Sequence, residues 1–253
     1  MAALQGRHAL VTGGGRGIGR AIAAALSAAG ASVTVVGRTE QSLQEAAAAG
    51  HAKGWIVGDV TRPEAMIDNL RILETVRGPV DILVANAGGA ESAPFAETTP
   101  SQFRDMFELN VMGVVHTVQA VLGGMVDRKF GRVVAIASTA GVKGYGYVSA
   151  YCAAKHAVVG LVRSLAIETA TTGVTVNAVC PGYTDTEMMR ESVARIVGKT
   201  GRTPDEAHAA ILKSNPLGRL VKPQEVAAAV LYLCSADAAA VTGTTLLVAG
   251  GEI

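Results

Sequence analysis

The sequence predicts an α/β protein with one doubly wound, seven-stranded parallel sheet. Short apolar runs recur along the chain with segments of helical pattern between them, which is typical of strands buried on both faces of a parallel sheet. Polar or glycine-rich residues follow several of these runs directly, and the carboxyl ends of parallel strands are where such folds bind ligands. The seven predicted strands cover residues 8–11, 33–36, 55–57, 82–84, 133–136, 174–176 and 246–248.

Length and composition favour a single domain. The chain has 253 residues, of which 49% are hydrophobic and 17% are charged, and this composition supports a large core. Because no proline- or serine-rich linker, charge block or repeat divides the chain, we expect one domain over residues 1–253. The formal net charge of +1 gives no reason to expect nucleic acid or a membrane surface as a partner.

The cysteines and the first residues predict a cytoplasmic protein. Cys152, Cys180 and Cys234 are widely spaced and form no C-x-x-C pair, as expected for reduced, buried thiols. Residues 1–7 lack the apolar centre of a signal peptide, and we expect no run long enough to span a bilayer. The histidines do not have the spacing of metal ligands, so the sequence predicts no metal site.

A glycine-rich turn joins the first predicted strand to the first predicted helix. Residues 12–19 have the pattern T-G-x-x-x-G-x-G. Glycine permits positive φ and lets the backbone approach a pyrophosphate, whose negative charge is favoured by the free N–H groups of a helix N-terminus. We therefore expect a dinucleotide phosphate here, with a flexible loop as the alternative. The predicted contacts are Thr12, Gly13, Gly15, Arg16, Gly17, Ile18 and Gly19.

A tyrosine and a lysine lie four residues apart in a later helical segment. At this spacing Tyr151 and Lys155 share one face of a helix. A free tyrosine has a pKa of about 10, and a neighbouring positive charge favours its phenolate. The pair is therefore a candidate for proton exchange at neutral pH. The alternative is a half-buried tyrosine beside a solvated lysine, which produces the same pattern.

The glycine turn and the tyrosine–lysine pair belong to a longer series of motifs. Its other members are Asn86-Ala87-Gly88, Asn110, Ser138 and Pro181-Gly182. In their order and spacing, and over nearly the whole chain, the motifs resemble those of the short-chain dehydrogenase/reductase family. The resemblance implies a Rossmann fold and an enzyme that interconverts a ketone and a secondary alcohol by hydride transfer with a nicotinamide cofactor.

The resemblance also implies roles for four catalytic residues. Tyr151 exchanges a proton with the substrate oxygen, and Ser138 donates a hydrogen bond that stabilises developing negative charge on that oxygen. Lys155 lowers the pKa of the tyrosine and holds the nicotinamide ribose, while Asn110 holds a water that links Lys155 to solvent. From the residues alone, Ser138 has the alternative role of a turn former or cap, and Asn110 that of a locally satisfied helix asparagine.

Cofactor choice depends on the residues that follow the second predicted strand. An acidic residue there binds the ribose hydroxyls of NAD, but this chain has Gly37 followed by Arg38. Arg38, together with Arg16 of the glycine turn, is suited to pair with a 2′-phosphate. The sequence therefore favours NADP(H). NAD(H) stays possible if Arg38 is a solvated residue that stacks on adenine.

The remaining cofactor contacts follow from the resemblance. Asp59 and Val60 match the family's adenine-contacting pair, with an Asx turn before Pro63 as the alternative. Thr184 or Thr186 is expected at the nicotinamide carboxamide, although Thr184 is also suited to cap the following helix. The other expected contacts are Asn86, Ala87, Gly88, Tyr151, Lys155, Pro181 and Gly182.

Two longer segments have expected roles outside the cofactor site. Residues 183–215 contain the threonines, glycines and proline of a helical lid that closes over the substrate. The family resemblance further implies a homotetramer, in which residues 100–125 and 149–170 pack against their counterparts in other subunits.

The substrate class is the least determined expectation. Residues 175–182 and 215–219 resemble the 3-oxoacyl thioester reductases of the family and their aromatic polyketide ketoreductase relatives, which implies reduction of a 3-oxoacyl thioester to the 3-hydroxyacyl thioester. Arg128 and Lys129 match a basic patch of carrier-protein-dependent reductases, but Thr172 stands where these often have a second basic residue. A coenzyme A thioester or a free ketone is then as compatible as an acyl carrier protein. Lys143 is suited to meet a thioester phosphate, or is an exposed loop lysine.

Two other functions share parts of this pattern. A secondary-alcohol dehydrogenase or ketone reductase that uses NAD on a non-thioester metabolite has the same motifs. A cofactor-binding regulatory protein needs only the glycine turn, and the intact Ser138, Tyr151, Lys155 and Asn110 argue against it.

Overall fold

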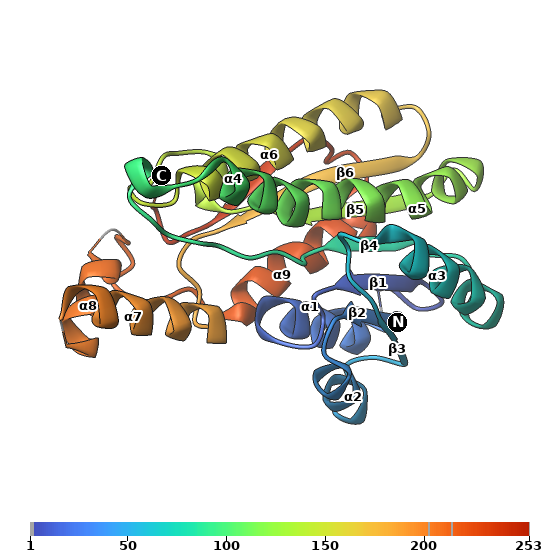
Figure 1. The fold of residues 1–253 in the computed structure, drawn as a ribbon. Helices are drawn as coiled ribbons and strands as arrows, with labels where there is room; N and C mark the ends of the chain where they lie inside the picture. Colours follow the sequence, from blue (N-terminus) through green and yellow to red (C-terminus); the bar gives the residue numbers. More distant parts are fainter. Residues whose placement is uncertain (1–2, 202, 214, 253) are drawn as a thin grey trace.

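A computed structural model describes residues 3–201, 203–213 and 215–252 of the chain, and it contains one seven-stranded parallel sheet (Figure 1). Positions 202 and 214 of the predicted lid lie outside the described residues. The strand order is β3-β2-β1-β4-β5-β6-β7, so the direction of winding reverses between β1 and β4. The strands are β1 (His8–Thr12), β2 (Ser32–Gly37), β3 (Gly54–Val57), β4 (Ile82–Ala85), β5 (Gly131–Ile136), β6 (Val174–Pro181) and β7 (Thr245–Val248).

Helices cover both faces of the sheet (Figure 1). One core cluster packs α3, α5 and α6 on one face, and a second packs α1, α2 and α9 on the other. The α-helices are α1 (Gly17–Ala28), α2 (Glu40–Ala48), α3 (Pro63–Arg77), α4 (Pro100–Phe107), α5 (Gly113–Asp127), α6 (Ser149–Thr169), α7 (Glu187–Thr200), α8 (Pro204–Leu212) and α9 (Pro223–Cys234). Short 3-10 turns are η1 (Phe95–Glu97), η3 (Thr139–Gly141) and η4 (Ala236–Ala238), and η2 (Glu108–Met112) is π-helical.

The continuous apolar runs of the sequence are explained by this two-sided burial. Successive side chains of a strand point to opposite faces of the sheet. In β1, Leu10 joins the cluster under α3, α5 and α6, whereas Ala9 and Val11 join the cluster under α1, α2 and α9. Both faces of the inner strands therefore favour apolar side chains, whereas the edge strand β3 leaves Trp55 and Val57 exposed on one face.

All seven predicted strands are confirmed, and β6 is longer than predicted. The predicted strand covers residues 174–176, but the strand continues to Pro181. Asn177 is fully buried, and its side chain donates to the Val241 carbonyl (2.8 Å) and accepts from the Thr244 amide (3.1 Å). Because the loop before β7 satisfies this amide, the strand tolerates it in its interior.

The expectation that no apolar run is long enough to span a bilayer is wrong. Two helical stretches, Pro100–Asp127 and Ser149–Thr169, are long and apolar enough to cross a membrane by length and composition. In each, 44% of the most apolar window is buried inside the protein, where α5 and α6 pack on the sheet. A core helix of this kind passes the same test, so the finding is weak evidence for a membrane span.

Candidate active site

The predicted site residues come together at the carboxyl edge of the sheet. Thr12 is the last residue of β1 and Pro181 the last of β6, while Asn86 follows β4 directly and Ser138 lies two residues beyond β5. Since β1, β4, β5 and β6 are neighbours in the sheet, residues far apart in sequence converge at one edge. This is the edge at which a doubly wound sheet binds its ligand.

Thr12 and Asn86 hold two loops of this edge together. The Thr12 hydroxyl accepts hydrogen bonds from the amides of Asn86 and Ala87, each at 3.0 Å, and the Asn86 side chain donates to the Thr12 carbonyl at 2.9 Å. These bonds are internal to the protein. The structure therefore gives both side chains the role of joining the ends of β1 and β4, while the backbone of the loops forms the surface of the site.

The glycine turn is shaped to admit a phosphate. Gly13 and Gly17 have positive φ values of 65° and 53°, and a Cβ on Gly19 would run into the Gly13 carbonyl. Among the described residues, no side chain caps α1 and no acid lies in its first turn. Its N–H groups are therefore available to an anion, and the turn fits the pyrophosphate of a dinucleotide.

The two arginines predicted to select the cofactor are exposed beside this turn. Arg38 follows β2 directly, and Arg16 stands at the N-cap of α1. Within the described part of the chain, no ion pair joins either guanidinium to a carboxylate. Both cations can therefore meet a phosphate without breaking an internal pair.

Asp59 makes the turn that the sequence offered as the alternative reading. Its Oδ1 atom accepts hydrogen bonds from the Thr61 amide (3.0 Å) and hydroxyl (2.9 Å). Burial alone would raise the pKa of Asp59, but these two bonds and the charges of Arg38 and Arg62 outweigh it and lower the pKa. The carboxylate thus stays charged while it fixes the loop that carries the buried Val60.

Ser138 has the capping role that the sequence offered as the alternative to the catalytic one. It is the N-cap of the 3-10 turn η3, and its Oγ accepts from the Ala140 amide at 3.1 Å. A hydroxyl that accepts in this way keeps its own proton for donation. The cap therefore orients the Ser138 hydroxyl. Burial raises the pKa of Tyr151, and a hydrogen bond from Ser138 offsets part of this rise.

Tyr151 and Lys155 have the predicted geometry, but their ionisation differs from the prediction. The Lys155 ammonium lies 5.7 Å from the centroid of the Tyr151 ring and donates to the Ile136 carbonyl at 2.9 Å. Burial raises the pKa of Tyr151 to about 12 and lowers that of Lys155 to about 8. In the protein alone, the desolvation of both groups outweighs any depression of the tyrosine pKa by the lysine.

Asn110 lies in the π-helical segment between α4 and α5 and is completely buried. Its side-chain amide donates to the carbonyls of Gly89 and Met106, both at 3.0 Å, and its Oδ1 accepts from the Gly89 amide at 3.3 Å. A Cβ on Gly88 would lie 2.7 Å from this Oδ1 and 3.5 Å from the Lys155 Nζ, so Asn110 and Lys155 meet at Gly88. The Oδ1 keeps one lone pair for a further donor.

The sequence offered Thr184 as an alternative cap of the lid helix, but the structure places Thr186 there. Thr186 is the N-cap of α7, where its hydroxyl accepts from the Met189 amide at 3.3 Å. Thr184 is instead buried and donates to the Gly182 carbonyl at 2.9 Å, next to a short bridge with Val221. The position of the cap follows from where the helix begins, and residue preferences alone do not fix that point.

A polar cluster beside Ser138 was missed by the sequence analysis. Glu252, next to the end of the chain, is buried between the loop after Ser138 and Gly182, and it pairs with Lys143 at 3.3 Å. Lys143 is therefore a half-buried, paired lysine and not the exposed loop lysine that the sequence offered as the alternative. No local pattern could have revealed this contact, because the partners are more than one hundred positions apart in the chain.

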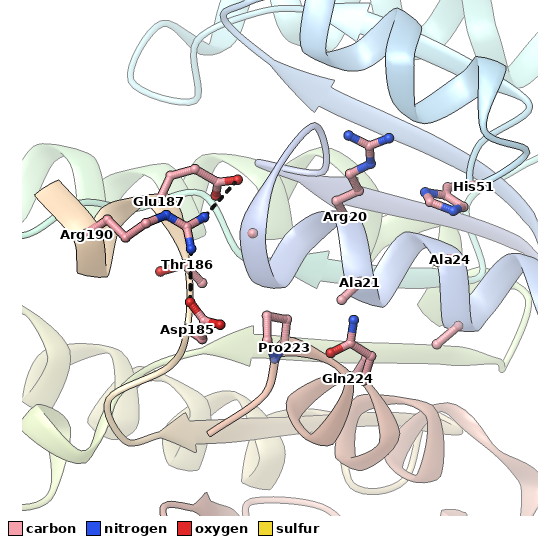
Figure 2. Close-up of a pocket in the computed structure, with 13 residues that line it drawn as sticks. Arg20, Ala21, Ala24, His51, Asp185, Thr186, Glu187, Arg190, Pro223 and Gln224 are labelled. Atoms are coloured by element: carbon pink, nitrogen blue, oxygen red, sulfur yellow. Dashed lines mark hydrogen bonds and ion pairs between the residues drawn. The ribbon is translucent and has the colours of Figure 1, made fainter. Parts of the chain in front are cut away.

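An open groove of about 510 Å³ lies between α1, α9 and the start of α7 (Figure 2). It meets the cofactor turn at Gly17 and the lid at Thr186, but it does not include Ser138, Tyr151 or Lys155. Arg190 on its wall is held by Asp185 at 3.0 Å and by Glu187 at 3.8 Å, as Figure 2 shows. The groove therefore borders the site of chemistry and is not that site.

Comparison with known proteins identifies relatives that are named as dehydrogenases and reductases. Residues 7–196 match the short chain dehydrogenase family. The chain is 41% identical to an acetoacetyl-CoA reductase of Rhizobium meliloti over 97% of its length and 98% of the relative's. It is 39% identical to a 3-oxoacyl-[acyl-carrier-protein] reductase of Haemophilus influenzae, with 98% of each chain covered.

A solved structure agrees over the full fold. A single-residue variant of actinorhodin polyketide ketoreductase with NADPH superposes with a TM-score of 0.94 at 38% identity, covering 100% of this chain and 99% of the other. The predicted family, Rossmann fold and enzyme class are thus confirmed. The glycine turn and the tyrosine–lysine pair lie at one edge of the seven-stranded sheet, and both the family match and the solved structure cover this region. This chain therefore belongs to the short-chain dehydrogenase/reductase family and is an oxidoreductase.

Proposed function

We propose that the protein reduces 3-oxoacyl thioesters to 3-hydroxyacyl thioesters with NADPH. The observation that carries the proposal is that Ser138, Tyr151 and Lys155 lie at the same sheet edge as the uncapped N-terminus of α1. The names of the relatives, an acetoacetyl-CoA reductase and a 3-oxoacyl-[acyl-carrier-protein] reductase, support thioesters as the substrate class.

In this mechanism the protein donates a proton to the substrate oxygen. Bound NADPH supplies the hydride to the carbonyl carbon. Ser138 donates a hydrogen bond to the carbonyl oxygen and thereby stabilises the negative charge that develops there. Because the pKa of Tyr151 is raised to about 12, its phenol is protonated at neutral pH, which is the state required of a general acid in the reductive direction.

Lys155 and Asn110 support this proton transfer. The buried Lys155 ammonium is anchored on the Ile136 carbonyl and is placed to hold the nicotinamide ribose. As Tyr151 gives up its proton, the ammonium stabilises the phenolate that forms. The free lone pair of Asn110 Oδ1, beside Gly88, is suited to a water that passes a proton from solvent to Lys155.

The preference for NADP(H) over NAD(H) is assigned to Arg38, with Arg16 as its helper. Both guanidiniums are exposed, Arg38 directly after β2 and Arg16 within the glycine turn at the N-cap of α1, and this is where we place the 2′-phosphate. The solved ketoreductase that resembles this chain holds NADPH, which supports the same choice. Backbone groups of Gly13, Gly17 and the turn between them are proposed to hold the pyrophosphate.

We propose that the thioester substrate is carried by coenzyme A rather than by an acyl carrier protein. In the basic patch, the Arg128 guanidinium is folded back to donate to the Val80 carbonyl at 2.7 Å. Thr172 also bonds internally, with its hydroxyl donating to the Thr169 carbonyl at 2.8 Å. Arg128 and Lys129 are both exposed on this face, but one N–H of Arg128 is already engaged and Thr172 adds no third basic group for a carrier protein.

We further propose that residues 1–253 form one catalytic domain, in which α7 and α8 of the 183–215 segment act as the substrate lid.

We also propose a homotetramer and a cytoplasmic location. The homotetramer is supported by the outer faces of α4 and α6, which leave Phe107 40% and Ile167 81% exposed. Three free, buried cysteines support a cytoplasmic location.

The proposal is tested by following nicotinamide absorbance with acetoacetyl-CoA and, in parallel, NADPH or NADH. We expect turnover that favours NADPH. Activity with free ketones or secondary alcohols but none with acetoacetyl-CoA would select the non-thioester dehydrogenase instead. Cofactor binding without turnover on any ketone or alcohol would select the regulatory protein.

A further inference from the structure

Residues 250–252 form a hook that buries a carboxylate beside the catalytic loop. Gly250 and Gly251 have φ values of 62° and 88°, a conformation that suits glycine, and they turn the chain back toward the sheet. A Cβ on Gly250 would lie 2.6 Å from both Asn215 Oδ1 and Leu217 Cβ, so the turn packs tightly. As a result the Glu252 side chain is fully buried, with 0% of it exposed.

The two oxygens of Glu252 have different surroundings. Oε1 accepts a hydrogen bond from the Tyr145 hydroxyl at 2.8 Å and pairs with the Lys143 ammonium at 3.3 Å. Oε2 is buried without a hydrogen-bond partner among the described residues, and a Cβ on Gly182 would lie 3.3 Å from it. The charge of Glu252 is therefore compensated on one side only, by Lys143.

Two chains of contacts connect this pair to the catalytic residues. The Tyr145 hydroxyl lies 2.7 Å from the hydroxyl of Thr139, the residue after Ser138. The Tyr145 ring meets the Tyr183 ring edge-on, with centroids 6.1 Å apart, and Tyr183 is close enough to Tyr151 to affect its pKa. The ion pair thus lies behind the residues that flank Ser138 and Tyr151.

Lys143 is held in place by two contacts. Its ammonium lies 4.9 Å from the centroid of the Tyr145 ring as well as 3.3 Å from Glu252, and its side chain is 29% exposed. A lysine held by a buried carboxylate is not available to a carboxylate of the substrate. If Glu252 lost its charge, the same ammonium would become an anion site next to the reacting carbonyl.

We propose that the Lys143–Glu252 pair makes the site select an uncharged 3-oxoacyl group and reject the free 3-oxo acid. A free 3-oxo acid carries its carboxylate two bonds from the ketone carbon, and it finds no free cation there because Lys143 is neutralised by the buried Glu252, so the desolvated carboxylate stays unpaired. A thioester or ester at that position is neutral and needs no cation. This inference rests on the proposed function, because it assumes a 3-oxoacyl group at Ser138 and Tyr151.

The test compares two ketones that differ in charge at this position, methyl acetoacetate and acetoacetate. In E252Q the freed lysine should lower the KM for acetoacetate, so that the kcat/KM ratio of ester to acid falls about tenfold or more. In K143Q the uncompensated carboxylate should raise the same ratio. D237N removes a charge from the exposed residue Asp237 and serves as the control, with an unchanged ratio.

An ester-to-acid ratio that stays at the wild-type value in both variants would overturn the inference. If E252Q does not fold, as judged by circular dichroism, the K143Q result decides, and the fold of K143Q is checked in the same way because this replacement leaves Glu252 buried without its counter-ion. Acetoacetyl-CoA is measured alongside. If the wild-type protein reduces methyl acetoacetate but not acetoacetyl-CoA, the thioester proposal is refuted. The charge inference is then still judged from the two ketones alone.

Discussion

The Lys155 ammonium and the Tyr151 ring lie on one face of α6, with the ammonium 5.7 Å from the ring centroid. The ammonium is also tied to the Ile136 carbonyl at the end of β5. This second contact fixes the lysine against the sheet, so its position relative to the tyrosine does not depend on helix geometry alone. A positive charge at this distance from a phenol stabilises the phenolate that remains after proton transfer.

The Tyr151→Phe variant tests the proton donor. We expect kcat for ketone reduction to fall by about 10²–10⁴, the usual contribution of a general acid. NADPH affinity, measured by fluorescence titration, should stay nearly unchanged because the ring is preserved. Turnover at the wild-type rate would contradict the mechanism.

The ionisation of Lys155 predicts how NADPH binding depends on pH. Its pKa is lowered from 10.5 to about 8 in the folded protein, so above pH 8 the free enzyme loses the ammonium that is expected to hold the ribose. Binding must then take up a proton, and the apparent Kd should rise with pH above about 8 while it stays level just below.

This proton uptake is measured by calorimetry in buffers of different ionisation enthalpy. The Lys155→Met variant provides the comparison, because it should bind more weakly and lose the pH dependence above about 8. An identical pH dependence in the variant would assign the effect to another group.

The Arg38→Ala variant tests cofactor selection. Removal of the guanidinium should reduce kcat/KM for NADPH by about 10- to 100-fold, the effect of a lost charge-assisted contact, and change that for NADH little. Arg71→Ala on α3 is a matched control, since Arg71 is also an exposed arginine, with 75% of its side chain accessible. If Arg38→Ala keeps its NADPH preference, Arg38 stacks on adenine or is simply solvated.

The proposed tetramer is tested on α6. Ile167 is 81% exposed in the single chain, so a charge there should disrupt a subunit interface without disturbing the core. We expect Ile167→Glu to shift the tetramer to smaller species in light scattering. Val76→Glu on α3 is the control, because Val76 is 77% exposed outside the predicted interface. A wild-type protein that is monomeric at working concentration would refute the assembly.

Local patterns were sufficient for the fold and for most of the candidate site. The seven strands were predicted because strands buried on both faces must be apolar throughout, and the site loops because they follow those strands directly. Where prediction failed, a distant partner or an unseen helix start was responsible: the buried Asn177 is satisfied by residues before β7, and Thr186 caps α7 because of where that helix begins. Neither leaves a trace in neighbouring residues.

The parallel sheet, the glycine turn and the spacing of Tyr151 and Lys155 can be predicted from the sequence, because they depend on backbone periodicity and on contacts within a few residues. The ionisation of that pair cannot, since desolvation depends on everything packed around it in the folded chain. The contact between Glu252 and Lys143 likewise arises from the folded arrangement. Electrostatic energy depends on distance in space and on burial, and neither can be read from distance along the chain.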